Sequence, residues 1–150
     1  EGGEYRYMLF DLDWAMFPST YERDRLKGDL LDPAGHGQGN FFSTTLQVKL
    51  MENPEFEKKF VERYAKFLNT IFKTDRMLKI LDENVAIVEP EMARQIARWG
   101  QPSSINSWKN MVATLRRITS EKRGLMIASL QQNFNLSQAR MKQLFPEDFQ

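Results

Sequence analysis

NPEFEKKFVERYAKFLNTI, residues 53–71, carries the strongest fold signal in the chain. Asn53 can accept hydrogen bonds from the free amides of a first helical turn, and Pro54 suits the first helical position. Apolar side chains then recur at helical steps, at Phe56, Phe60, Tyr64, Phe67, Leu68 and Ile71. This spacing places them on one broad face and predicts an amphipathic helix.

Helical spacing continues on both sides of this run. It predicts further helices over residues 41–51, 74–88, 91–99, 103–134 and 137–145. Thr74 is expected to cap the second of these, and Pro90 to break or kink the chain before the third. Gly100 and Pro102 are expected to stop that third helix, and Ser103 or Ser104 to cap the next. Gly124 either ends this next helix or merely interrupts it.

One segment near the start of the chain is typical of a strand. Over Glu4–Phe10, Tyr5, Tyr7 and Leu9 alternate with Glu4, Arg6 and Met8 before the run becomes wholly apolar. We therefore predict a mainly α fold, a bundle-like lobe of about five to seven helices with a short N-terminal strand or strand pair. The single domain 1–150 would comprise a strand and motif segment (5–17), a long glycine-containing loop (18–40) and a helical region (41–145).

Composition limits the classes of protein that this sequence can belong to. The 150 residues suffice for one core, and 41% are hydrophobic, which is not a disordered composition. Cysteine is absent, so neither a disulfide framework nor a thiolate metal site is available. No apolar run approaches the length of a membrane-spanning helix. Acidic residues exceed basic ones before residue 54 and basic residues exceed acidic ones after residue 100, although the net charge is only +1.

Asp11 and Asp13 are the best candidates for chemistry. They directly follow the predicted strand and precede the long loop, which places two carboxylates at the edge of the core. Magnesium prefers oxygen ligands and is commonly bound by one or two carboxylates together with substrate phosphates. Aspartates also cap turns and helices through backbone hydrogen bonds, so the residues alone leave a structural alternative open.

Other reactive residue types give weaker signals. His36 is the only histidine and lies among Gly35, Gly37 and Gly39, where we expect a solvated loop residue and not a metal ligand. Arginines and lysines of the predicted helices near Trp99 and Trp108 are scattered and form no stripe. We therefore expect no nucleic-acid partner.

Several segments, in this order, resemble the C-terminal half of the CotH kinase family, which is named for spore coat protein H. They are Tyr7-Met8-Leu9-Phe10-Asp11-Leu12-Asp13-Trp14, Leu50–Phe56, Leu68-Asn69-Thr70 with Phe72, Ile87–Met92, Arg98-Trp99-Gly100 with Pro102-Ser103, and Trp108. The order and spacing of these pieces carry the resemblance, since no single piece is diagnostic.

The resemblance implies an atypical protein kinase, secreted or spore-associated, that uses ATP and a divalent metal such as Mg²⁺ to phosphorylate serine. It assigns Asp11 and Asp13 to metal binding, in the role of the metal-binding Asp of ordinary kinases. Asp11 follows the strand directly and is expected to be the primary ligand, although the analogy does not settle which carboxylate contacts the ion. An extracytoplasmic or cell-surface location is implied in the same way.

Only ten residues precede Asp11, and the first residue is Glu1, so we expect the nucleotide-binding groups in an N-terminal lobe of the same protein. On that expectation the 150-residue chain contains no catalytic residue of its own and is inactive alone, because phosphoryl transfer needs several positioned groups at once. Apolar surface left bare without that lobe would favour self-association. The alternative hypothesis is a helical structural or protein-interaction module without catalytic activity.

Overall fold

The computed structural model describes residues 16, 18–32 and 42–149. Over these residues the chain is mainly helical, as predicted, with six α-helices. The elements in chain order are a π-helical turn η1 (Leu26–Leu30), α1 (Phe42–Met51), α2 (Pro54–Asn69), α3 (Thr74–Val88), a 3₁₀ turn η2 (Glu89–Glu91), α4 (Met92–Trp99), α5 (Ile105–Asn133) and α6 (Gln138–Leu144). The strand predicted over residues 4–10 lies outside the described residues.

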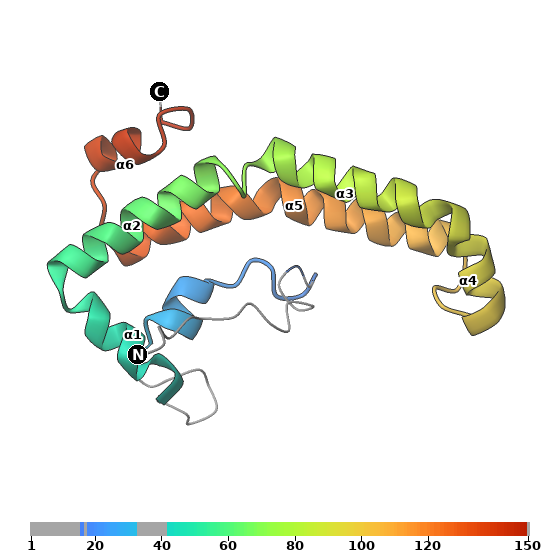
Figure 1. Ribbon diagram of the computed structural model, residues 1–150, viewed down its shortest axis with the longest axis horizontal. Helices are drawn as coiled ribbons and strands as arrows, with labels where there is room; N and C mark the ends of the chain where they lie inside the picture. The colour runs from blue at the N-terminus through green and yellow to red at the C-terminus, as the bar shows by residue number, and fades with distance from the viewer. Residues whose placement is uncertain (1–15, 17, 33–41, 150) are drawn as a thin grey trace, which may run out of the picture.

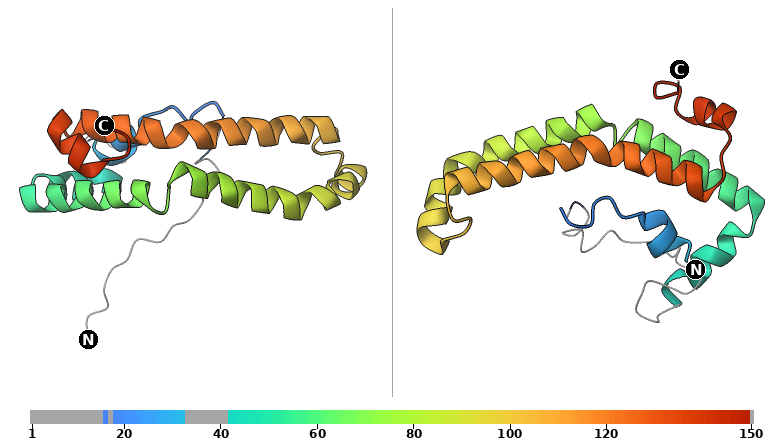
Figure 2. Two further views of the ribbon diagram at one scale, coloured as in Figure 1. Left: turned by 90° about the horizontal axis from the view of Figure 1, so that it is seen from above. Right: turned by 180° about the vertical axis from the view of Figure 1, so that it is seen from behind.

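Helices α2 and α3 follow one another in a row, and α5 runs antiparallel beside both of them (Figure 1). With 29 residues, α5 is about 43 Å long, since each helical residue adds about 1.5 Å. Figure 2 shows the two rows side by side from above and as a shallow arch from behind. The segment that ends in η1, together with α1, lies under the concave side of this arch, while α6 lies on the outer side.

Local sequence signals explain where two of the helices begin. The side chain of Asn53 accepts hydrogen bonds from the amides of Glu55 and Phe56, as predicted, at 3.0 and 3.3 Å. Ser104 caps α5 by accepting from the Ser107 amide at 3.0 Å. Each cap pairs an amide that the first helical turn would otherwise leave without a partner.

Thr74 was predicted to cap the next helix, and this detail was wrong. Thr74 is the first residue of α3, and Lys73 precedes it without a side-chain hydrogen bond to the helix. The extended backbone of Lys73, at φ −61° and ψ 133°, places the helix start one residue earlier than a threonine cap would. Such shifts of one residue are common because cap preference is only one of several influences on a helix end.

Proline and glycine separate or end the next helices largely as expected. Pro90 lies in η2 between α3 and α4, because proline cannot supply the amide that a continuous α-helix requires. Gly100 ends α4 with a left-handed backbone at φ 66° that glycine adopts without a steric penalty. Gly124 was expected to end or to interrupt the helix, but α5 continues through it unbroken.

The main core lies at one end of the arch. It joins α2, the C-terminal half of α5, η1 and the chain around α6, through Leu26, Val61, Ala65, Leu68, Ile127, Leu130, Met141 and Phe145. Phe60 adds tilted ring contacts with Tyr64 and Phe134, with centroids 5.9 and 5.7 Å apart. Burial of these apolar groups is the dominant stabilising contribution to this end of the molecule.

The other end is a projecting two-layer arm, which we call the hairpin arm and define as residues 74–115. Met92 is its only buried residue. Large apolar side chains remain in solvent there, with Ile87 74%, Trp99 62% and Met111 61% exposed. The hairpin arm is therefore held mainly by the contact between α3 and α5 and has no core of its own.

Arg123 links the C-terminal end of the chain to the main core through hydrogen bonds and an ion pair. Its guanidinium donates to the Leu68 carbonyl and to Asn69 Oδ1, both at 3.0 Å, and it forms a two-pronged ion pair with Asp148. The hydrogen bonds from Arg123 hold the pKa of Asp148 below its ordinary value, although partial burial opposes the shift.

None of the described helices combines the length and hydropathy that crossing a bilayer requires.

Candidate functional site: the segment that follows the acidic pair

The predicted metal ligands Asp11 and Asp13, and likewise His36, lie outside the described residues. The first described residue is Met16, three residues after Asp13. Among the described residues no group of three or more acidic or histidine side chains is arranged to bind a metal ion. The described residues nearest to the acidic pair in the sequence are therefore 16 and 18–31, the segment that follows it.

Tyr21 attaches this segment to the middle of α5. Its ring is buried, and its hydroxyl donates to Glu121 Oε2 at 2.6 Å. Arg117 donates to the same hydroxyl oxygen at 2.7 Å and to Glu121 at 2.9 Å, so the three side chains form a closed polar ring. The Arg117 guanidinium also lies 5.3 Å from the centre of the tyrosine ring, within cation–π range.

The charged side chains around Tyr21 shift the pKa of its hydroxyl in opposite directions. The hydrogen bond to Glu121 raises the pKa of Tyr21, and Arg117 offsets only part of that shift. Lys122, one residue further on, donates to the Tyr21 backbone carbonyl at 2.5 Å. Burial, with a contribution from nearby Arg25, lowers the pKa of the Lys122 ammonium. The side chain and backbone of Tyr21 are thus both bound to α5.

Asp24 makes a second attachment two turns further along α5. Its carboxylate accepts from Ser129 Oγ at 2.6 Å, from Asn133 Nδ2 at 2.7 Å and from the Lys27 amide at 3.1 Å. Burial alone would raise the pKa of Asp24, but these hydrogen bonds outweigh it and leave the pKa below its ordinary value. We call the contacts of Tyr21 and Asp24 with α5 the α5 anchor.

The α5 anchor borders the apolar core. Burial, and to a lesser degree the negative charge of Asp24, raise the pKa of Tyr64 to about 12. Tyr64 is therefore a neutral phenol at ordinary pH, and its ring packs with the core cluster of α2 and α5. Leu26 of η1 is buried in the same cluster, so the segment is held by apolar packing as well as by hydrogen bonds.

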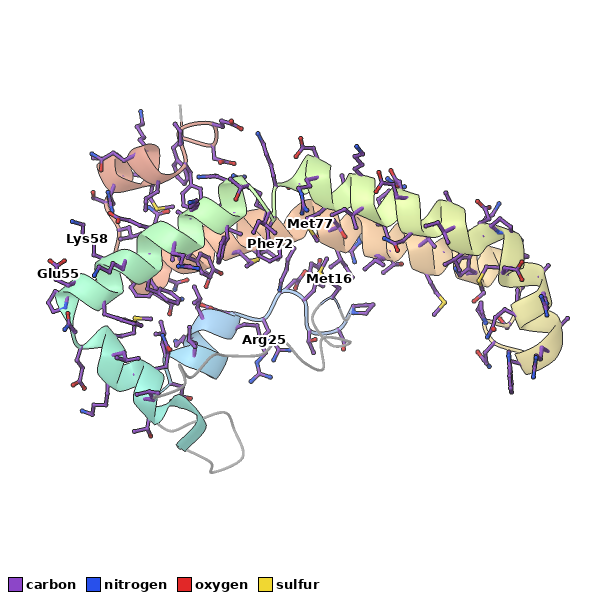
Figure 3. The ribbon with its side chains drawn as sticks, in the orientation of Figure 1. Met16, Arg25, Glu55, Lys58, Phe72 and Met77 are labelled. Carbon is purple, nitrogen blue, oxygen red and sulfur yellow. The ribbon has the colours of Figure 1, made fainter. Side chains whose placement is uncertain are left out.

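A cavity of about 780 Å³ lies between the start of this segment and the N-terminal half of α5. Met16 and Pro18 form one wall. The other wall comes from the beginning of α5 and includes Asn106, Ser107, Asn110, Met111, Thr114 and Leu115. Figure 3 shows Met16 on the segment that runs beneath α5. We call this space the Met16 cavity.

The corner between α4 and α5 holds the family-like residues of the second half of the chain. Arg98 lies 4.8 Å above the Trp99 ring, and Gly100 reverses the chain with its left-handed backbone. A second, apolar hollow of about 440 Å³ lies beside this corner, against Pro102, Trp108 and Val112. These residues shape the end of the hairpin arm, and the described part of the chain brings no acidic metal cluster to them.

Sequence reasoning did not single out the residues of the α5 anchor. Tyr21 and Asp24 lie in a segment without helical or strand periodicity, and their partners are about a hundred positions further along the chain. The uneven distribution of charge was a partial signal, since an acidic N-terminal region meets a basic C-terminal one here. It could not identify Ser129 or Asn133, which are uncharged.

Comparison with known families identifies the class of protein. The family of the CotH kinase protein matches residues 1–126, which is most of the chain. The chain therefore belongs to the CotH kinase family, as the order of its motifs predicted. No match was found among curated proteins or among solved structures.

Proposed function

We propose that this chain contributes the metal-binding carboxylates of an ATP-dependent serine kinase of the CotH type. Asp11 and Asp13 are the proposed ligands of Mg²⁺ or another divalent cation. The observation that supports the proposal is the family match over residues 1–126, which includes both aspartates. The groups that bind the nucleotide are proposed to come from an N-terminal lobe of the same protein, so residues 1–150 alone would not transfer phosphate.

The donor set has the right chemistry for this role. Two carboxylates separated by one residue offer hard oxygen ligands, and Mg²⁺ is usually bound by one or two carboxylates together with phosphate oxygens and water. A bound divalent ion would neutralise negative charge on the phosphates of ATP during transfer. In the reaction, the serine oxygen bonds to the γ-phosphorus, the bond to the bridging oxygen breaks, ADP departs and the hydroxyl proton is released.

The α5 anchor supports this proposal as a positioning device. Kinase chemistry depends on holding a few groups in a fixed geometry, and small displacements reduce the rate strongly. Tyr21 lies eight residues after Asp13, and it is bound to a long helix by both its backbone and its side chain. The segment that follows the acidic pair thus has a rigid support within the described part of the chain.

The proposal is tested with the full-length protein, ATP, Mg²⁺ and a general serine-containing acceptor such as dephosphorylated casein. We expect Asp11→Asn and Asp13→Asn each to lower phosphate transfer at least about a hundredfold, as the loss of a metal ligand does. Glu83→Gln is the matched control, since it removes one exposed carboxylate from α3. Activity equal to wild type in both aspartate variants would refute the assignment.

A specific observation favours the alternative of an interaction module. The hairpin arm exposes the large apolar side chains of Ile87, Trp99 and Met111, and apolar surface left in solvent is a feature of regions that bind another protein. A module without catalysis predicts no binding of ATP or Mg²⁺ by the full-length protein. The kinase assignment predicts both, so titration of the protein with each ligand separates the two functions.

A further inference from the structure

The two helical rows of the arch are interrupted or weakened at the same level. In the first row, residues 70–73 separate α2 from α3 and are not helical. In the second row, α5 is continuous but contains Gly124. Arg123, the residue before it, donates to the Leu68 carbonyl near the end of α2, which brings the break and the glycine side by side. We call residues 70–73 and Gly124 together the hinge.

Packing does not account for the glycine in α5. An added Cβ at Gly124 would meet no atom within 4 Å, and the helix passes through this position unbroken. A glycine is therefore needed neither for a close approach nor for a left-handed backbone. What it adds is conformational freedom, at a cost of about 1 kcal/mol compared with alanine. Small residues of this kind are often found where a fold bends.

The hinge separates two bodies that pack differently. Helix α2 packs against α1, α5 and α6 in the main core, whereas α3 packs against α5 and η2 in the hairpin arm. Met92 is the only buried residue of the arm. The arm therefore has few apolar contacts that would resist a change in its angle to the main core.

The C-terminal end of the described chain spans the hinge on the outer side of the arch (Figure 1). We call residues 145–149 the C-terminal tail. Asp148 Oδ2 accepts from Arg123 Nη2 at 2.8 Å, directly before the glycine of the hinge. Glu147 pairs with Lys73, directly before α3, at 2.9 Å. The tail is thus bound to both helical rows at the level of the hinge.

The C-terminal tail is held in the main core by apolar packing and reaches the hinge through charges. Phe145 is fully buried in the core cluster. The side chains of Arg123 and Asp148 are 14% and 29% exposed, whereas those of Lys73 and Glu147 are 40% and 71% exposed. An exposed ion pair contributes little, so the pair of Arg123 with Asp148 is the main contact. This pair can open while Phe145 stays buried.

The α5 anchor spans the hinge on the concave side of the arch. Tyr21 binds α5 before Gly124, and Asp24 binds it after Gly124. This attachment resists an outward swing of the hairpin arm, as the C-terminal tail resists an inward one. Room for an inward swing exists, because the Met16 cavity of about 780 Å³ lies on this side of α5.

We infer that the C-terminal tail is a latch that fixes the angle between the hairpin arm and the main core. When the pair of Arg123 with Asp148 opens, the arm swings about the hinge toward the concave side. The hinge and Arg123 lie within residues 1–126, which match the family, whereas the tail lies beyond them. The angle of the arm is thus set from outside the family match, and the inference does not depend on the metal assignment.

Distances between two nitroxide labels in the full-length protein test this inference. Non-natural amino acids carry the labels at Lys58 of α2 and Ala93 of α4, which are both exposed (Figure 3 shows Lys58). Double electron–electron resonance gives the distribution of distances. Asp148→Ala removes the acidic partner of Arg123. Glu62→Gln is the matched control, since it removes an ion pair between α2 and α6 that does not cross the hinge.

We expect wild type and Glu62→Gln to give the same narrow distribution. Asp148→Ala should broaden it at least about twofold and shift it toward shorter distances, because the arm swings inward. Adding Gly124→Ala to Asp148→Ala should narrow the distribution again, since alanine restricts the backbone of α5. Helix content measured by circular dichroism should be equal in all four proteins.

Four results would overturn the inference. The first is the same distribution in Asp148→Ala and wild type, and the second is an equal broadening in Glu62→Gln or a shift to longer distances. The third is a broadening that Gly124→Ala leaves unchanged, which would place the flexible point elsewhere. The fourth is a loss of helix content in Asp148→Ala, which would make the C-terminal tail part of the core and not a latch.

Discussion

Asp24 accepts hydrogen bonds from a neighbouring amide and from two side chains near the end of α5. A single carboxylate therefore joins the segment after the acidic pair to the longest helix of the molecule. Its pKa lies below the ordinary value because these hydrogen bonds stabilise the charged form against the cost of burial. At the scale of single residues, this makes the stability of the segment sensitive to acid.

Replacing Asp24 by asparagine should destabilise the fold at neutral pH by about 1 kcal/mol, because charge-assisted hydrogen bonds become neutral ones. A carboxylate with a lowered pKa stabilises the folded state above its unfolded pKa and loses that effect as the pH falls through its folded pKa. The difference between wild type and Asp24→Asn should therefore be full at pH 7 and shrink below about pH 4.

Urea unfolding of both proteins at several pH values measures this difference. Glu83→Gln serves as the control, since its exposed carboxylate should contribute little at any pH. An Asp24→Asn deficit that stays constant down to pH 3 would contradict the role given to the ionised carboxylate.

Element boundaries were largely predictable because their causes are local. Asn53, Pro90, Gly100 and Ser104 act on the helix turn in which they lie, and the structure confirms each of them. The π-helical turn η1 was not predicted, since it lies in a segment without periodicity. The α5 anchor could not be predicted either, because its partners become neighbours only when the whole chain folds.

Two glycines of neighbouring elements should respond in opposite ways to the same change. Gly124 lies inside α5, and an added Cβ there would meet no atom within 4 Å. Gly124→Ala should therefore stabilise the fold by about 0.5–1 kcal/mol, because alanine loses less backbone entropy in a helix. Gly100→Ala should destabilise it by about 1 kcal/mol, because Gly100 has a left-handed backbone.

Urea midpoints of the two variants at constant m-value provide the measurement. A destabilising Gly124→Ala would show that α5 needs a flexible point at this position. A neutral Gly100→Ala would show that the corner between α4 and α5 can relax without its left-handed residue.

At the scale of the whole molecule, the two ends of the arch differ in packing. The main core joins α2, η1, α6 and the C-terminal half of α5, whereas the hairpin arm buries only Met92 (Figure 1). Regions with few buried apolar contacts open at lower free energy than the rest of a fold. Composition predicted enough apolar material for one core, but not that it would gather at one end.

Hydrogen exchange followed by mass spectrometry should reveal this asymmetry. Amides of α3 and α4 are expected to exchange at least about tenfold faster than those of α2 and of α5 around Ile127 and Leu130. Uniform protection along both helical rows would contradict the account. Protection of α3 and α4 that appears only at high protein concentration would instead indicate self-association through the exposed apolar residues of the arm.

Asp11 and Asp13 are proposed to bind a divalent ion for phosphoryl transfer. Titration of the full-length protein with Mn²⁺ in the presence of ATP, followed by electron paramagnetic resonance, tests this proposal most directly. We predict one tight site in wild type and in Glu83→Gln, weakened at least about tenfold in Asp11→Asn and Asp13→Asn. Equal Mn²⁺ affinity in all four proteins would contradict the claim.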